Sequence, residues 1–180
     1  MTTPANPGAS GRDALPLDPK LAPGQGLPRL LELIRTSRQL ADFTSERVSQ
    51  AMGVDMQPSS RNAGDYSFYE PVTSEWLQGL DFSRQHQRLR FSFDPVQPGT
   101  SPDLASVCQF DFDQFASALE AGGFKRSQNL GEHGRLLGYT FERMRDGKPE
   151  MRLEITPEGA QAGSDGTATS RSCIRTIYVY

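Results

Sequence analysis

The chain of 180 residues has only two histidines, two cysteines and one tryptophan. His86 and His133 stand in no HExxH or HxxxH spacing and the cysteines form no CxxC pair, so the sequence predicts no metal site. A GxSxG turn is missing, which argues against a hydrolase nucleophile of that type. A glycine-rich phosphate loop is missing as well, which argues against nucleotide binding. We therefore expect no cofactor.

An excess of charge of one sign is also lacking. The sequence has 19 Lys and Arg against 22 Asp and Glu, a formal net charge of -3, whereas a general nucleic-acid binder carries a basic excess. No apolar run is long enough to span a bilayer, and no basic segment followed by an apolar one forms a signal peptide at the start. A cytosolic protein has this pattern, and so does an exported or lipid-anchored protein whose targeting segment has been removed.

The chain divides into a short tether and one domain. Residues 1–26 hold five of the 13 prolines and no aromatic residue, so this segment has too little apolar surface to order itself. We expect it to be a disordered Pro/Gly/Ala-rich tether of the kind that separates an anchor from a folded domain. Residues 27–180 are then a single domain, long enough to bury a core without a metal.

Apolar spacing and capping residues predict three helices in this domain. Pro28 suits the first turn of a helix over 28–39. Thr44 is the expected N-cap of a second helix that ends at Met52, with Gly53 after it. The clearest helix covers 112–121, where Asp111 and Gln114 have the spacing of a capping box.

Alternation of apolar and polar residues indicates strands with one buried face. The expected strands are 76–82, 89–93, 107–110, 137–141, 151–155 and 173–180. Residues 54–75 are expected to form a long loop with room for a short strand at its aromatic residues, and Gly159–Ser172 a second loop. The prediction is an α+β domain with an antiparallel sheet of five to six strands and two or three helices packed on one face.

The two cysteines allow two interpretations. Cys108 and Cys173 both lie in predicted strands, on faces that point inward. They are either buried free thiols of a cytosolic protein or a disulfide of an exported one. We favour the disulfide because the tether also suggests export, to an oxidising compartment such as a bacterial periplasm.

The only concentrated group of polar residues with catalytic potential is Glu132, His133 and Arg135. Neighbouring residues of an extended segment point in opposite directions, and Gly131 and Gly134 indicate a loop. Catalysis needs a nucleophile, base or metal held in place by supporting contacts, which this sequence does not offer elsewhere. We therefore favour a surface loop and expect no enzyme, although a small enzyme that uses this loop is an alternative.

A binding protein needs only aromatic and arginine side chains on a rigid scaffold. The sequence offers an aromatic segment from Tyr66 to Trp76, the glycine-flanked loop, and an outward strand face with two arginines. We expect the first two to form the contact region, with the arginine strand as the next candidate. The candidate partner-binding residues are Tyr66, Phe68, Tyr69, Glu132, His133, Arg135, Arg88 and Arg90.

Five segments, which span most of residues 38–180, carry a resemblance to a known class of protein. They are LADFTSERVSQAMG, YSFYEPVTSEW, CQFDFDQFASALEAGGF, GEHGRLLGYTFER and SCIRTIYVY. Together they resemble small immunity proteins encoded beside bacterial secreted toxins.

The resemblance implies a noncatalytic inhibitor that is anchored in, or exported to, the periplasm. Such a protein binds an incoming effector of a bacterial secretion system, here a cell-wall hydrolase or a lipase, and blocks its active site. The sequence shows no lipobox, so a lipid anchor would have to lie upstream, and no inhibitory residue transfers from the class. A cytosolic adaptor is a further alternative.

Overall fold

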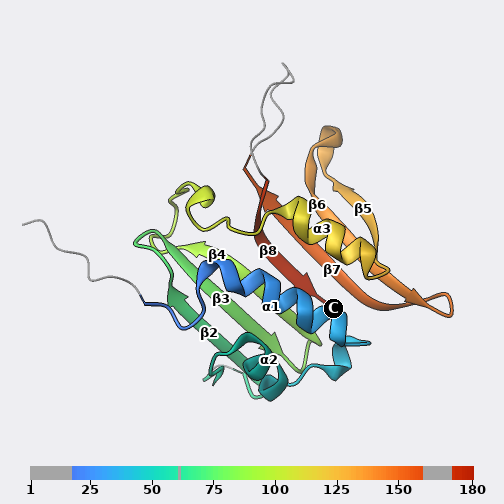
Figure 1. Ribbon diagram of the computed structural model, residues 1–180, viewed down its shortest axis with the longest axis horizontal. Helices are drawn as coiled ribbons and strands as arrows, with labels where there is room; N and C mark the ends of the chain where they lie inside the picture. Colours follow the sequence, from blue (N-terminus) through green and yellow to red (C-terminus); the bar gives the residue numbers. More distant parts are fainter. Residues whose placement is uncertain (1–17, 61, 160–171) are drawn as a thin grey trace, which may run out of the picture.

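One antiparallel sheet with helices on a single face forms the protein in the computed structural model, which describes residues 18–60, 62–159 and 172–180 (Figure 1). The eight strands follow the order β1-β2-β3-β4-β8-β7-β6-β5. This confirms the α+β class and the antiparallel sheet. Five of the expected strands form, and β1, β2 and β5 join them, so the sheet has more strands than the five to six predicted.

The helices are α1 (Pro23–Thr36), α2 (Ser45–Met52) and α3 (Phe112–Ala121), with short 3-10 turns η1 (Leu40–Asp42), η2 (Leu104–Ser106) and η3 (Glu132–Gly134). The strands are β1 (Gln57–Pro58), β2 (Asp65–Pro71), β3 (Trp76–Ser83), β4 (Arg88–Pro95), β5 (Lys125–Leu130), β6 (Leu136–Arg145), β7 (Lys148–Glu158) and β8 (Cys173–Val179).

The element order repeats once along the chain. Helices α1 and α2 precede β1 to β4, and α3 precedes β5 to β8. The last strand of each half lies at the centre of the sheet, where β4 and β8 pair antiparallel with Phe91 opposite Ile177. The first strand of each half lies at an outer edge. The chain therefore contains two similar halves arranged about an approximate two-fold axis between β4 and β8.

The two predicted helix caps are confirmed. Thr44 accepts a hydrogen bond from the amide of Arg47 at the start of α2, and Gly53 ends that helix in the left-handed conformation that glycine adopts without strain. Asp111 and Gln114 form the capping box of α3. These local signals define helix ends because they satisfy backbone groups that a helix leaves unpaired.

The N-terminal helix begins earlier than predicted. Helix α1 starts at Pro23 rather than Pro28, within the segment expected to be tether. Just before it, the amides of Lys20 and Leu21 donate to the carboxylate of Glu70 on β2, and Leu21 is fully buried. Residues 18–26 thus belong to the folded domain; residues 1–17 lie outside the described residues, as does most of the loop expected at 159–172.

The predicted strand at 107–110 is wrong. Residues 104–106 form the turn η2, and the chain then runs without strand pairing to α3. The apolar residues Val107, Cys108 and Phe110 pack this connecting segment against the core and do not pair in the sheet. Cys108 nevertheless forms a disulfide with Cys173 at the start of β8. The predicted bridge is therefore confirmed, and it indicates an oxidising compartment.

The hydrophobic core lies between the sheet and the helices. Phe91 and Phe93 from β4, Phe115 from α3 and Phe141 from β6 are almost completely buried there. Figure 1 shows the helices on one side of the strands, so the opposite side, here called the open face, has no helix over it. Within the described residues, no helix is both long enough and apolar enough to cross a membrane.

Candidate partner-binding site

The open face carries polar and aromatic side chains from adjacent strands. On β4, Leu89 and Phe91 enter the core, so Arg88 and Arg90 point to the open face, as the sequence predicts. Register places Asp81 of β3 opposite Arg90, and Tyr69 of β2 opposite Gly79, two residues from Asp81 on the same face. The sequence predicted Tyr69 and the arginine strand as separate candidate surfaces. In the structure they lie side by side on one face.

Arg90 is the centre of a hydrogen-bonded network on this face. Its Nη1 donates to the Tyr69 hydroxyl and to Asp81 Oδ2, both at 3.1 Å. Its Nη2 donates to both carboxylate oxygens of Asp94, at 3.0 and 3.1 Å. The Arg90 side chain is 22% exposed, so the network is neither buried nor fully screened by water. It fixes the guanidinium and the tyrosine ring in one geometry.

Gly79 makes room for the Tyr69 ring. A Cβ atom built at Gly79 would overlap the ring carbons Cε1 and Cδ1 of Tyr69. Because Gly79 lies directly opposite Tyr69 in the ladder, the ring lies flat across the β3 backbone. In this position the Tyr69 hydroxyl donates to Asp81, while 45% of the residue stays exposed. Gly79 is thus a positioning residue for an aromatic side chain that a partner protein can reach.

The pKa of the Tyr69 hydroxyl is raised well above the ordinary tyrosine range. Partial burial is the main cause, followed by the hydrogen bond to Asp81 and the charge of that carboxylate; Arg90 opposes them. A raised folded-state pKa means that this group stabilises the fold below about pH 10, and that the contribution is lost as pH rises through the folded pKa.

A titration of phenol absorbance tests this arrangement. At about pH 11 an ordinary tyrosine is roughly 90% ionised, whereas we expect Tyr69 to stay protonated, so the wild-type and Tyr69→Phe spectra change equally. Gly79→Ala should displace the ring from Asp81 and add one phenolate that the Gly79→Ala/Tyr69→Phe double variant lacks. An extra phenolate at Tyr69 in the folded wild type would contradict the geometry.

The open face continues from β4 onto β8. The guanidinium of Arg88 lies over the ring of Tyr178, 5.3 Å from its centroid. Tyr178 stacks on Tyr180, with ring centroids 6.1 Å apart. Arg88 forms no ion pair with another described residue, and Tyr180 is 38% exposed. Aromatic and arginine side chains therefore form a continuous surface from β2 across β4 to the end of the chain.

A polar hollow of about 750 Å³ lies within this surface. Its lining includes Asp65, Ser67, Tyr69, Asp81, Arg88 and Tyr178. The carboxylate of Asp65 has a lowered pKa, caused mainly by its hydrogen bond with Ser83. The hollow therefore contains acidic, basic and uncharged hydrogen-bonding groups beside the rings of Tyr69 and Tyr178.

Two of the predicted aromatic contacts lie elsewhere. Tyr66 and Phe68 belong to strand β2, where the sequence left room for a short strand, and both pack against the core. Alternation along β2 separates them from Tyr69, which points to the other face. The predicted contact segment from Tyr66 to Trp76 therefore splits, because Trp76 is also completely buried.

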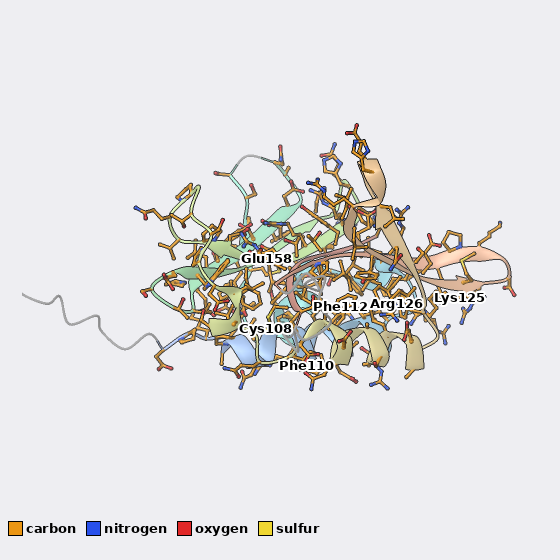
Figure 2. All side chains as sticks on the ribbon, turned by 90° about the horizontal axis from the view of Figure 1, so that it is seen from above. Cys108, Phe110, Phe112, Lys125, Arg126 and Glu158 are labelled. Carbon is orange, nitrogen blue, oxygen red and sulfur yellow. A yellow bond between two sulfur atoms is a disulfide. The ribbon has the colours of Figure 1, made fainter. Side chains whose placement is uncertain are left out.

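The glycine-flanked segment lies far from this surface. Glu132, His133 and Arg135 form and follow the turn η3, at the tip of the β5–β6 hairpin. Four strands separate β2 from β6 in the sheet order, roughly 24 Å at the usual strand spacing. Figure 2 shows that hairpin end projecting from the sheet on the side away from the helices. Tyr69 and the tip are thus two separate candidate contacts, not one.

The tip does not bring Glu132 and His133 into a recognisable catalytic arrangement. Neither side chain hydrogen-bonds to another described residue. His133 has φ of +58°, in the left-handed region, at the turn itself. Within residues 18–60, 62–159 and 172–180, no group of three His, Cys, Asp or Glu lies close enough to hold a metal ion.

Several residues of the open face were not predicted from the sequence to belong to a site. Asp81 and Asp94 were not singled out, and Tyr178 and Tyr180 were expected only as residues of the terminal strand. The spacing of Arg90 and Asp94 places them on one face, but the pairing of Asp81 with Arg90 depends on strand register. Comparisons with models of protein families, with curated proteins and with solved structures found no match for this chain.

Proposed function

We propose that this protein is a noncatalytic binding protein, an immunity protein that neutralises a secreted antibacterial effector by forming a one-to-one complex. The effector is a cell-wall hydrolase or a lipase. The observation that carries the proposal is the open face on which Tyr69, Arg90 and Arg88 converge. Tyrosine and arginine are the residues that most often dominate binding energy at protein interfaces.

The network around Arg90 supports this function through its rigidity. A side chain that is already fixed before binding loses little conformational entropy on forming a complex. Arg90 is held by Asp81 and Asp94, and Tyr69 is held by Asp81 and Arg90. The binding surface is therefore organised in the free protein, as a tight inhibitor requires.

The disulfide supports a location in an oxidising compartment. A structural disulfide forms and persists outside the reducing cytosol, and the Cys108–Cys173 bridge ties the connecting segment to the central strand β8. We place the protein in the bacterial periplasm. This is where a secreted cell-wall hydrolase or lipase meets its target.

Calorimetric titration of the purified chain against the secreted effector encoded beside it tests the proposal. Tyr69→Ala should weaken binding by roughly 30-fold and Arg88→Ala by roughly tenfold, because both remove interface anchors. Met144→Ser, an equally exposed apolar residue on β6, is the control and should bind as wild type. Thermal unfolding of each variant separates lost contact from lost structure.

Two results would contradict the proposal. If the effector does not bind the oxidised, folded chain, the protein is not its immunity partner. If it binds with the same affinity to wild type, Tyr69→Ala and Arg88→Ala, the open face is not the contact surface.

A further inference from the structure

The Tyr69 ring on the open face has one covered side and one uncovered side. Its inner side lies on the backbone of Gly79, where a Cβ atom would overlap the ring. Its outer side carries no second ring and no guanidinium from the part of the chain that the structure describes. The Tyr178 ring differs, because Arg88 lies over it and Tyr180 stacks on it. Tyr69 is therefore the flat aromatic surface on which a ligand can lie.

Hydrogen-bonding groups without a partner lie beside this ring. The Tyr69 hydroxyl and Arg90 both donate to the same oxygen of Asp81, Oδ2. The other oxygen, Oδ1, accepts no hydrogen bond from the described residues, and the Asp81 side chain is 38% exposed. The guanidinium of Arg88 lines the same hollow and donates to no side chain or carbonyl of the described residues. A ligand in the hollow thus meets a free acceptor and free donors next to the aromatic ring.

The charges that line the hollow balance one another. The lining contains two carboxylates and two guanidiniums, those of Asp65, Asp81, Arg88 and Arg90. It also includes His86, and histidine is mostly neutral at pH 7. The hollow therefore has no excess charge that would select an ionic ligand. An apolar ligand fits no better, because it would leave the charged groups and several serine hydroxyls without hydrogen-bond partners.

We infer that the hollow binds a neutral oligosaccharide, with one pyranose ring lying on Tyr69. A pyranose has a flat face of C–H bonds, which the electron-rich face of an aromatic ring attracts, and an edge of hydroxyl groups. One hydroxyl donates to Asp81 Oδ1 and another accepts from Arg88, and hydrogen bonds to charged groups are the stronger kind. The volume of about 750 Å³ is ordinary for a small-molecule site, for which about 300–1,000 Å³ is typical.

The site is organised before a saccharide arrives. Tyr69 is fixed by Gly79 beneath its ring and by hydrogen bonds of its hydroxyl with Asp81 and Arg90. Fixed groups lose little conformational entropy on binding. Saccharide binding does not depend on the proposed effector binding, although both use the outer side of Tyr69, so the two ligands exclude each other.

The experiment titrates the full oxidised chain with chitotriose or maltotriose in the absence of any effector, followed by NMR of the backbone amides. We expect one of them to bind with a Kd of about 1 mM or tighter, and to shift the amide signals of Gly79 and Asp81. Sorbitol has the hydroxyl groups but no pyranose ring, so it is the ligand control and should not bind. Chitotriose represents the amino-sugar glycan of a cell wall, and maltotriose represents a free glucan.

Three variants separate the contributions of ring and donor. Tyr69→Ala removes the ring and Arg88→Ala removes the donor, and each should weaken saccharide binding by about tenfold. Tyr69→Phe keeps the ring and should bind within about threefold of wild type, because the lost hydroxyl already bonds to Asp81. Met144→Ser, an exposed apolar residue on β6, is the control and should bind as wild type.

Each outcome either supports the saccharide site or rejects it. Binding of chitotriose assigns the hollow to cell-wall glycan, and binding of maltotriose alone assigns it to a glucan; both support the site. No binding of either at about 10 mM, ten times the expected Kd, overturns it. Equal binding by wild type, Tyr69→Ala and Arg88→Ala overturns it too, as does equal binding of sorbitol or tighter binding of inorganic phosphate. Since no effector is present, these results leave the proposed function to its own titration.

Discussion

Removal of the Cys108–Cys173 disulfide should lower the free energy of unfolding by about 4 kcal/mol, the loop-closure value for a bridge of this span. The bridge joins residues 65 apart in sequence, so breaking it raises the conformational entropy of the unfolded chain. In the folded state it pins the connecting segment before α3 to β8, where the Phe112 amide also donates to Ser172. Chemical denaturation of the Cys108→Ala/Cys173→Ala variant measures the loss.

Reduction of the wild type provides the control. Reduced wild type and the double variant should unfold at nearly the same denaturant concentration, and reductant should leave the double variant unchanged. Equal midpoints for oxidised and reduced wild type would show that the bridge does not stabilise the domain.

Arg143→Ala should be the most damaging substitution of a single charged residue, with a loss of about 2–3 kcal/mol. Its Nη2 donates to the carbonyls of Ser37 and Arg38, at 2.6 and 2.7 Å, just after α1. Its Nε donates to Glu150 at 3.1 Å, and both side chains are mostly buried. The guanidinium also lies over Phe124. Alanine would leave the buried carboxylate and two carbonyls without this donor.

Two other variants distinguish this role from simple charge. Arg143→Lys keeps the charge but cannot reach the carbonyls and the carboxylate together, so it should recover only part of the stability. Arg152→Ala removes an exposed ion pair with Glu154 and should cost less than about 0.5 kcal/mol. If Arg143→Ala is as mild as Arg152→Ala, the contact between the two halves does not depend on this arginine.

The sequence predicted those elements whose signals are local. The capping box at Asp111 and the N-cap at Thr44 define helix ends through bonds within four residues. The turn at Asp146–Gly147, with both residues at positive φ, joins the predicted strands as β6 and β7, and Asp-Gly is a sequence typical of such a hairpin turn. The outward direction of Arg88 and Arg90 follows from the period of two along β4.

Elements without such a local signal were missed. Strand β5 has the sequence KRSQNL and is almost fully exposed, because it lies at the sheet edge and buries neither face. Charged residues are common on edge strands, where they discourage pairing with other chains. The segment at Cys108 was predicted as a strand and is not one. Its apolar residues pack against the core without joining the sheet.

The sequence predicted which residues take part in the candidate site but not that they lie together. Tyr69, Arg88 and Arg90 were all singled out, yet their meeting depends on the register between β2, β3 and β4. Tyr66 and Phe68 were grouped with Tyr69 in one contact segment, although the sequence allowed a short strand there. As a strand, it sends alternate side chains to opposite faces. The tip of the β5–β6 hairpin was singled out for its polar residues Glu132, His133 and Arg135.

The most direct test of the central claim is a titration of the effector's hydrolytic activity with the oxidised chain. A stoichiometric binder predicts a linear loss of activity that reaches zero near about one equivalent, while about a tenth of an equivalent removes only about a tenth of the activity, however long the incubation. The Tyr69→Ala variant should require an excess. Progressive loss of all activity at a tenth of an equivalent would show that the chain acts catalytically and would contradict the account.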